Sequence, residues 1–581
     1  MIAWSLLIAL VLVYSITLPP LLKRAGLNGM LGYIPLVNFF PMLKMIKRPW
    51  YWFFVILCPG INLMLLVVMN VELGIVFGKR STKDQWLFGA LPWLALPQLA
   101  FKEKNLPYLG PRDWTGKKKS MMREWSEALL FAVIAASAIR TFFFEAFTIP
   151  TPSMEKSMLV GDYLFVSKLS YGPKVPQTPL AVPFLHNALP GGMTNSYSEA
   201  MSLPYFRLPG FGDVERLDPV VFNFPHGDTI MVDPFYAGHD YYSYVRKEAL
   251  LIAEAISIAE GYDNYIKNPS NYESIAFRNY QQNKGWKSGY ANLLSNPDYY
   301  YNLARRNFSN SHACKVCGFE QGKRKFMLQG VRYRPMDKRE NYVKRCIGTP
   351  GDELSIINRQ VHINGQPQQD PEGVMHSYQF QVKSPAALKK IYAEYKVNIN
   401  DRNTVNDSGA TVYQSSFTAS DAEALKNNSD ILFIEVNNDT LPEAFDPQAL
   451  FPNSPLSPFN TWTRDNFGPL HIPAKGETVQ LTPQNIALYR RVIQNYEGNT
   501  LQIVDGKAII NGAAAVSYTF KQGYYWMMGD NRHQSADSRY WGFVPEDHIV
   551  GKPVFTWLSK EDPNYQETAE LRWKRMFRFV D

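Results

Sequence analysis

Three short segments carry the residues whose types and spacing could perform chemistry. They are IPTPSMEKSMLVGD at residues 149–162, NYVKRCIGTPGDE at residues 341–353, and GDNRHQSADSRYWGFVPEDHIVG at residues 529–551. The first segment presents two Ser-Met pairs, at Ser153 and Ser157, on a backbone that prolines restrict, because proline fixes its own φ and holds the preceding residue extended. A serine hydroxyl is a weak nucleophile, so each of these serines would need a neighbouring base.

The sequence offers a lysine as that base. It has no GxSxG elbow of the kind that presents the serine of many hydrolases. For a lysine to be neutral near pH 7.4, its ordinary pKa of about 10.4 must fall by about 3 units, which corresponds to roughly 4 kcal/mol. Burial against apolar side chains lowers the pKa in this direction. Lys344 follows Tyr342 and Val343 in a strand-like run, whereas Lys156 and Lys168 lie in more polar stretches.

Four apolar runs precede the first segment, and we expect them to form a membrane region. Residues 2–20 lack the positive start and the cleavage site of a signal peptide, so we interpret them as a retained anchor. Residues 50–77 are long enough to span despite Pro59 and Gly60. Residues 85–101 are short and contain two prolines, so they either span with a kink or lie in the interface. Residues 128–147 make the clearest span.

The basic residues predict the orientation of these runs. Residues 102–123 contain seven Lys and Arg, and residues 23–48 contain five. Loops rich in Lys and Arg stay in the cytoplasm. Four spans put both loops inside and everything after Phe147 outside, whereas three spans would put residues 23–48 outside. We therefore expect four spans, with the large remainder of the chain exported.

The exported part reads as mainly β. Short β-rich runs bounded by Gly, Asn and Pro recur along it, and two pieces, DELSIINRQVHINGQP and NTLQIVDGKAIINGAA, are similar enough to suggest equivalent sheet positions. Two long polar blocks interrupt these runs, and we interpret them as α+β insertions. The expected division is an α-helical multi-span region at 1–124, an anchor at 125–148, a β core at 149–235, 337–366 and 483–581, and insertions at 236–336 and 367–482.

Charge and cysteine content exclude several classes of function. The net charge of +8 comes from basic residues that are scattered among acids or clustered beside apolar runs, which is not the pattern of a nucleic-acid-binding face. Four cysteines in 581 residues exclude a disulfide scaffold. Cys314 and Cys317 form a CxxC with one nearby histidine, which is at most three zinc ligands where a structural site uses four. We expect a local disulfide or inert thiols there.

Taken together, the three segments resemble the signature boxes of bacterial type I signal peptidases, or leader peptidases. The patterns IP..SM…GD, KR.IG.PGD and GDNR…S.DSRYWGFVP occur in the family's order, and the last is close to diagnostic. Extra amino-terminal spans and large insertions are similar to the form found in Bacteroidetes. The resemblance implies a signal-peptidase-type β fold and a membrane serine endopeptidase that removes signal peptides from exported preproteins after Ala-x-Ala sites.

The resemblance also implies roles for individual residues. Ser153 would be the nucleophile and Lys344 the general base. Thr151 and the Ser153 backbone N–H would form the oxyanion hole. Ser535 would orient the lysine amine, and Asp537 and Arg539 would make a structural ion pair beneath the site. The shallow apolar pockets for small substrate side chains would be lined by Phe147, Ile149, Met158, Leu164, Tyr342 and Val343.

One local departure from the family pattern concerns the residues after the serine. The family usually has SMxPTL, and this chain has SMEKSML, with Lys156 in place of proline and Ser157 in place of threonine. Ser157 is therefore a rival nucleophile. Aligned without a gap, Ser153 keeps the expected distance from Gly161 and Asp162, and Ser157 does not.

Other interpretations stay open at this point. His533 lies inside the third segment, so a Ser-His-Asp arrangement is conceivable. A self-cleaving serine-lysine regulator would need a DNA-binding module, and a non-catalytic secretion factor could use the same fold. Under the peptidase interpretation no cofactor or metal is expected. The partners would be exported preproteins and the lipid bilayer, with the secretion translocon as a candidate. The location would be the bacterial inner membrane, with the catalytic domain on the periplasmic side.

Overall fold

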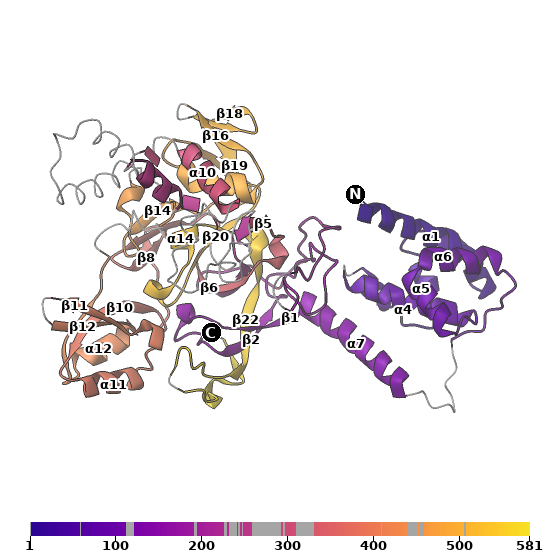
Figure 1. Cartoon of the computed structure of the whole chain (residues 1–581), viewed down its shortest axis with the longest axis horizontal. Helices are drawn as coiled ribbons and strands as arrows, with labels where there is room; N and C mark the ends of the chain where they lie inside the picture. Colours follow the sequence, from indigo (N-terminus) through magenta and orange to yellow (C-terminus); the bar gives the residue numbers. More distant parts are fainter. Residues whose placement is uncertain are drawn as a thin grey trace. The chain divides into compact units, whose positions relative to one another are not determined.

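The chain folds into two compact units. The computed structural model describes residues 2–57, 60–111, 121–190, 194–225, 229–231, 241, 245–246, 248–257, 292–293, 297–309, 331–407, 410–439, 450–452, 458–504, 507–566 and 568–580. The helical unit contains Met1–Ala146 and Ser167–Gly212, and the β unit contains Phe147–Val166 and Asp213–Asp581 (Figure 1). The predicted contrast between a helical amino-terminal region and a mainly β remainder is confirmed.

The helical unit packs its helices around an apolar core. Its elements are α1 (Ile2–Arg24), η1 (Gly29–Tyr33), α2 (Phe39–Met45), α3 (Trp52–Ile56), α4 (Ile61–Val76), α5 (Thr82–Ala90), α6 (Pro92–Pro97), the π turn η2 (Gln98–Lys102) and α7 (Met121–Phe142). Leu18 and Leu73 belong to the core. Tyr14 donates a 2.7 Å hydrogen bond to Asn70 Oδ1 and so ties α1 to α4. Because both polar groups are buried, this pairing avoids the cost of leaving them unsatisfied.

The second and third predicted spans are divided in the structure. The second run contains α3 and α4, and Gly60, at φ +85°, precedes α4. The third contains α5, α6 and η2. Leu91 leaves the helical conformation directly before Pro92, because proline disfavours that conformation in the residue ahead of it. Among the described residues, one helix is long and apolar enough to cross a membrane, Glu124–Phe142 within α7. The multi-span arrangement stays a prediction.

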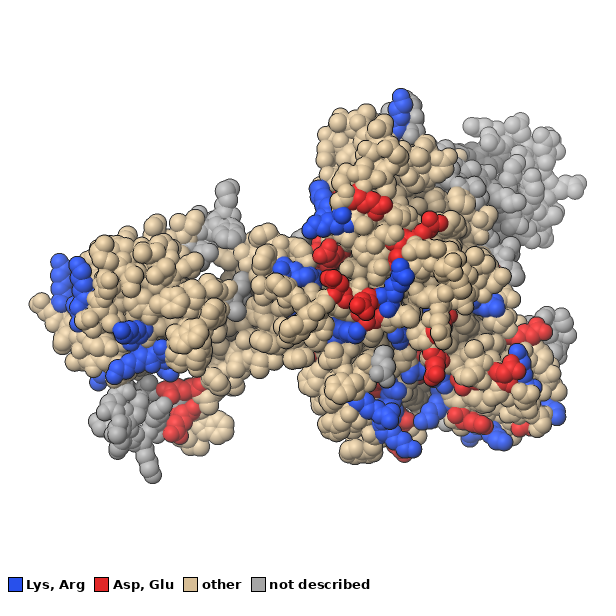
Figure 2. Space-filling view, turned by 180° about the vertical axis from the view of Figure 1, so that it is seen from behind, with Lys and Arg blue, Asp and Glu red and all other residues tan. Residues whose placement is uncertain are grey.

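The helical unit exposes many large apolar side chains. On the face drawn in Figure 2, residues other than Asp, Glu, Lys and Arg cover most of its described surface. The exposed side chains include Leu12, Ile16, Trp50, Phe54, Trp86, Leu94, Trp125, Leu129, Phe131 and Ile139. Soluble proteins rarely expose so many large apolar side chains on one unit, so this unit has a surface suited to lipid or to another apolar partner.

An eight-stranded sheet organises the β unit. Its order is β1-β2-β22-β3-β6-β20-β21, with β23 also paired to β22. Within it, Val220 pairs with Lys344, and Arg345 pairs with Met528, so the lysine lies on an interior strand. The strands are β1 (Phe144–Thr148), β2 (Asp162–Ser167), β3 (Pro219–Asn223), β6 (Asn341–Gly348), β20 (Tyr524–Met528), β21 (Val544–Pro545), β22 (Ile549–Ser559) and β23 (Arg578–Phe579).

The two similar sequence pieces form two meanders with the same register. The first consists of β7 (Glu353–Ile357), β8 (Gln360–Ile363) and β9 (Gln366–Pro367), and the second of β16 (Leu501–Val504), β17 (Lys507–Ile510) and β18 (Ala513–Ala515). Leu354 pairs with Ile363 in one, and Leu501 with Ile510 in the other. The meanders belong to different sheets. The first also pairs with β14 (Phe467–His471), and the second forms a three-stranded sheet of its own. The two pieces are therefore alike as hairpins, but the expectation that they hold equivalent sheet positions is wrong, because they belong to different sheets.

Residues 375–436 form a lobe of the β unit with its own sheet and its own apolar core. We call it the insertion lobe. Its sheet has the order β11-β12-β10-β13, and two helices pack on a core that contains Phe380 and Phe417. The elements are β10 (Met375–Val382), α11 (Pro385–Glu394), η7 (Ile399–Asp401), β11 (Asn403–Asp407), β12 (Ala410–Thr418), α12 (Ala419–Lys426) and β13 (Ile431–Val436).

Short elements complete the described part of the β unit. They are η3 (Pro152–Met154), β4 (Thr229–Met231), α10 (Pro297–Ser309), β5 (Val331–Tyr333), η6 (Met336–Lys338), η8 (Phe459–Thr461), β15 (Thr478–Gln480), α13 (Ile486–Arg491), the π turn η9 (Val492–Tyr496), β19 (Ser517–Thr519), η10 (Arg532–Gln534), α14 (Ser538–Trp541), η11 (Glu546–His548) and η12 (Trp573–Arg575). Cys314 and Cys317, and much of the predicted first insertion, lie outside the described residues.

Candidate active site

Ser153 and Lys344 meet in the β unit. Ser153 lies in the short 3-10 turn η3, and Lys344 lies on β6. The two residues are 191 positions apart in the chain. The Lys344 Nζ atom is 2.6 Å from Ser153 Oγ, and it also donates to the Val343 carbonyl at 3.1 Å. Both residues are buried, with 8% and 3% of their surface exposed. This distance is within the range that proton transfer between the two groups requires.

Burial lowers the pKa of Lys344 to about 8, and the nearby carboxylates of Asp537 and Asp530 act in the opposite direction. Removal of the ammonium from water disfavours its charged form. At a pKa of about 8, roughly a fifth of the molecules carry a neutral amine at pH 7.4. Lys344 is therefore able to accept a proton near physiological pH, which is the property that a lysine base needs.

The rival serine is engaged elsewhere. Ser157 Oγ donates a 2.5 Å hydrogen bond to Asp530 Oδ2, and the guanidinium of Arg345 binds both oxygens of that carboxylate at 2.7 and 2.8 Å. Arg345 also reaches Ser157 Oγ at 3.4 Å. Ser157 thus belongs to an ion-pair network, while Ser153 holds the contact with the lysine.

The supporting residues surround the serine and lysine in different ways. Thr151 Oγ1 lies 3.5 Å from Ser153 Oγ. Asp537 and Arg539 form an ion pair of 2.8 Å, and both are almost fully buried. Ser535 is buried too, and its Oγ donates to the Ala536 carbonyl at 3.5 Å. Its predicted bond to the lysine amine stays a prediction.

Most of the predicted pocket residues gather in two adjoining apolar clusters that share Val343. One cluster contains Ile149, Met158 and Leu164, and Phe147 packs with the other. Tyr342 points to different neighbours: its ring packs on Phe224 and Trp541, with centroids 4.5 and 5.8 Å away. The structure therefore brings these residues together beside the lysine strand, and their contact with a substrate stays a prediction.

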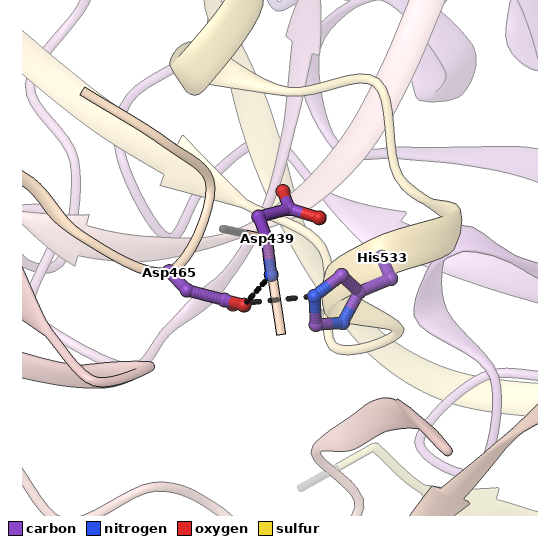
Figure 3. A group of neighbouring side chains, drawn as sticks. All are labelled: Asp439, Asp465 and His533. Carbon is purple, nitrogen blue, oxygen red and sulfur yellow. Dashed lines mark hydrogen bonds and ion pairs between the residues drawn. The ribbon is translucent and has the colours of Figure 1, made fainter. Parts of the chain in front are cut away.

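His533 lies in a hydrogen-bonded network with two aspartates. Figure 3 shows Asp465 between the His533 ring and the Asp439 backbone. His533 Nδ1 accepts from the Ser377 backbone N–H at 3.2 Å, and its Nε2 lies 3.2 Å from Asp465 Oδ1. The three side chains have ligand-type atoms within 4.8 Å of one another. However, Arg464 already binds both oxygens of Asp439. We interpret the group as a structural network, in which His533 Nδ1 accepts a hydrogen bond and Nε2 lies within ion-pair distance of Asp465.

Asp530 and Arg345 are functional candidates that residue-by-residue reasoning missed. Both stand inside the quoted segments, in GDNR and KRCIG, but the sequence does not reveal that they pair. Their ion pair joins β6 to the loop after β20, and its carboxylate is one of the charges that act on Lys344. Their position within two of the three motifs was the available signal.

Comparison with protein families matches most of the chain. The family described as "Signal peptidase, peptidase S26" matches residues 122–284, 287–421 and 472–558. A family of unknown function, DUF5684, matches residues 30–111. The first match includes Ser153, Lys344 and the third segment, and the second falls within the helical unit.

Curated relatives agree with the first match. Signal peptidase I of Buchnera aphidicola subsp. Acyrthosiphon pisum is 27% identical over 250 residues, which cover 42% of this chain and 58% of the relative. Signal peptidase I of Haemophilus influenzae is 41% identical over 66 residues, covering 11% and 19%. Signal peptidase I of Aquifex aeolicus is 47% identical over 49 residues, covering 8% and 19%. The matched stretches thus span at most 58% of these relatives' own lengths.

Proposed function

Because the chain belongs to the signal peptidase family, peptidase S26, we propose that it is a membrane-bound serine endopeptidase that removes signal peptides from exported preproteins by cutting after Ala-x-Ala sites. The observation that carries this proposal is the buried contact of 2.6 Å between Lys344 Nζ and Ser153 Oγ. The relatives are named signal peptidase I, which supports the same class of substrate.

In the proposed reaction, neutral Lys344 takes the proton of Ser153 as Oγ attacks the carbonyl carbon of the scissile peptide bond. The oxyanion that forms accepts hydrogen bonds from the Ser153 backbone N–H and the Thr151 hydroxyl, a contribution often worth about 10²-fold in rate. The lysine then returns the proton to the leaving amine, and the signal peptide stays bound to Ser153 as an ester. Lys344 next deprotonates a water molecule, which hydrolyses the ester and restores the serine.

The proposed substrate lies extended beside the serine. β1 is the last strand at one end of the sheet order, and a terminal strand can pair with an added chain. Alternate substrate side chains would then reach the apolar clusters around Val343. Small side chains at the first and third positions before the cut would fit beside such closely packed residues, in line with the proposed Ala-x-Ala preference.

The bilayer is the proposed setting of the reaction. α7 exposes Leu129, Phe131 and Ile139, and it ends at Phe142, shortly before Ser153. A serine tethered so close to an apolar helix would meet a cleavage site as it leaves the membrane. The seven basic residues of 102–123 favour a cytoplasmic side for the start of α7, which places the β unit on the exported, periplasmic side. The translocon stays a candidate partner.

The proposal is tested with the full chain in liposomes and a preprotein that carries an Ala-x-Ala site, with both products identified by mass. We expect the intact chain to cut after that site, and Ser153→Ala and Lys344→Ala to lose at least about 10³-fold in kcat/KM. Ser420→Ala and Lys426→Ala, two changes at exposed positions of the insertion lobe, serve as matched controls and should cut normally. If both active-site variants cut like the intact chain, the assignment is wrong, and if the intact chain cuts nothing, a non-catalytic secretion factor becomes the better account.

A further inference from the structure

Lys156 reaches out of the segment that carries the nucleophile and contacts the insertion lobe. We call residues 152–158 the serine loop. Lys156 Nζ donates to the Tyr395 carbonyl at 3.2 Å and lies 3.2 Å from Asp421 Oδ2. The side chains of Lys156 and Asp421 are 31% and 22% exposed, so solvent screens their attraction only in part.

Both contacts suit a cation. Tyr395 is the residue after α11, so its carbonyl belongs to the end of the helix that carries partial negative charge. Asp421 is in the first turn of α12, where its backbone N–H is capped by Thr418. The ammonium of Lys156 thus lies between the end of one helix and the start of the next.

The backbone of Lys156 has an unfavourable conformation. Its φ is +71°, in the left-handed region that residues with a Cβ rarely adopt and that glycine adopts freely. Proline cannot occupy this position in this conformation, because its ring holds φ near −65°. A lysine keeps such a conformation only where surrounding contacts determine it, and the contacts with Tyr395 and Asp421 are of that kind.

The insertion lobe also touches the active-site loops through its first strand. The Met375 backbone N–H donates to the Asp530 carbonyl at 2.8 Å, and Asn531 donates to the Ser153 carbonyl at 3.1 Å. Just before β10, Gly373 packs so closely that an added Cβ would lie 2.7 Å from Ser157 Oγ. The lobe is therefore connected to the segment that holds Ser153 by two routes. One runs through residues 530–531, and the other runs through Lys156.

We propose that Lys156 is a positioning residue for the reaction, which fixes the serine loop to the insertion lobe through Asp421 and the Tyr395 carbonyl so that Ser153 Oγ stays in reach of Lys344. The inference rests on the proposed function, because its readout is catalysis by Ser153. Under this proposal, the second insertion helps to position Ser153 in every catalytic cycle. Lys156 itself touches neither substrate nor the reacting atoms.

The test compares Lys156→Met, Lys156→Gly, Lys156→Arg and Asp421→Asn in the full chain, with Lys426→Met as the matched control. Lys426 pairs with Glu423 on the exposed side of α12. We expect Lys156→Met and Asp421→Asn to lower kcat by about 10-fold or more, since misplacement of a reacting group by 1 Å can cost about 10²-fold. KM should change by less than about twofold, because substrate binding is left intact. Lys156→Arg should restore most of kcat.

Lys156→Gly separates the contact from the backbone strain. Glycine relieves the strain at φ +71° but removes the side chain, so we expect it to lose as much kcat as methionine does. A second readout is the rate at which a serine-directed acylating inhibitor modifies Ser153, followed by intact mass, which should slow in parallel with kcat.

The outcomes of this test are distinct from those of the proposed function. If the intact chain fails to cleave the preprotein, the proposed function fails. If the intact chain cleaves, and Lys156→Met, Lys156→Gly and Asp421→Asn match it in kcat and in acylation rate, the positioning role is overturned. An equal fall in kcat for Lys426→Met would overturn it too, because the effect would then be a general one of lost surface charge.

Discussion

At Lys344, burial prevails over two carboxylates that favour the charged amine. Asp537 and Asp530 both act to raise the pKa of the lysine, and burial still brings it down to about 8. Each carboxylate has its own guanidinium partner, Arg539 for the first and Arg345 for the second. Because each negative charge is matched by a positive one, its pull on the lysine is weakened, and the amine can lose its proton near neutral pH.

Ser157→Ala tests the choice between the two serines. The change removes the hydrogen bond to Asp530, but Arg345 still binds both oxygens of that carboxylate. We expect a loss of stability of about 1 kcal/mol and a kcat/KM within several-fold of the intact chain. Preprotein cleavage and urea unfolding measure the two effects. Complete loss of cleavage in a folded variant would make Ser157 the nucleophile.

Glu155→Gln tests a buried carboxyl next to the serine. Burial raises the pKa of Glu155 to about 7, and Lys156 and Arg572 oppose that rise in part. The unfolded carboxyl releases its proton near pH 4.5 and the folded one near pH 7, so stability should fall as pH rises through this window and stay lower above it. This difference in pKa corresponds to roughly 3 kcal/mol of stability.

We therefore expect Glu155→Gln to unfold at higher denaturant than the intact chain at pH 8 and to lose this advantage at pH 4.5. Urea unfolding at the two pH values is the measurement. A difference that is the same at both would show that Glu155 does not hold its proton in the folded state.

At the scale of elements, the motifs predicted which strands and loops meet. They did not predict the hydrogen bonds and ion pairs that hold these elements together. The strand-like run around Lys344 and the two similar hairpins could be foreseen because their patterns are local. The bond from Lys156 to the insertion lobe could not, because its partners follow 239 and more positions later and leave no periodic signal. The break before Pro92 could be anticipated in part, because the two prolines of residues 85–101 predicted either a kinked span or an interfacial position.

Gly529→Ala tests the packing of β20 against the serine loop. An added Cβ at Gly529 would lie 2.5 Å from the Ser153 carbonyl and would also overlap Ser535. Because these neighbours are backbone and a buried side chain, we expect the serine loop to shift, with stability lower by about 1–3 kcal/mol and kcat/KM lower by about 10²-fold.

The matched control is Gly212→Ala, where no heavy atom lies within 4 Å of the added Cβ. Cleavage assays and urea unfolding are run on both variants. A Gly529→Ala chain that cuts as fast as the Gly212→Ala chain would mean that the loop tolerates displacement.

At the scale of the whole molecule, the chain joins an apolar helical unit to a β unit that holds the candidate site. Basic residues before α7 predict that the β unit is exported. The structure supplies one helix of spanning length and composition among its described residues, so the number of spans is left to experiment.

Cysteine labelling tests the orientation. We expect Val516→Cys, at a position that is 77% exposed in the β unit, to react with a membrane-impermeant maleimide on intact spheroplasts. Lys104→Cys, at an exposed position before α7, should react only after the membrane is opened. The unsubstituted chain gives the background from its own cysteines. The reverse pattern would place the β unit in the cytoplasm.

The most direct test of the central claim is the pH dependence of kcat/KM for preprotein cleavage by the full chain. The claim is that Lys344 acts as a neutral base toward Ser153, and its pKa in the structure is about 8. The rate should therefore rise with pH, with its midpoint near that value, and level off above it. A profile that stays flat from about pH 6 to 9 would contradict the claim, since the protonation state of a lysine with this pKa changes within that range.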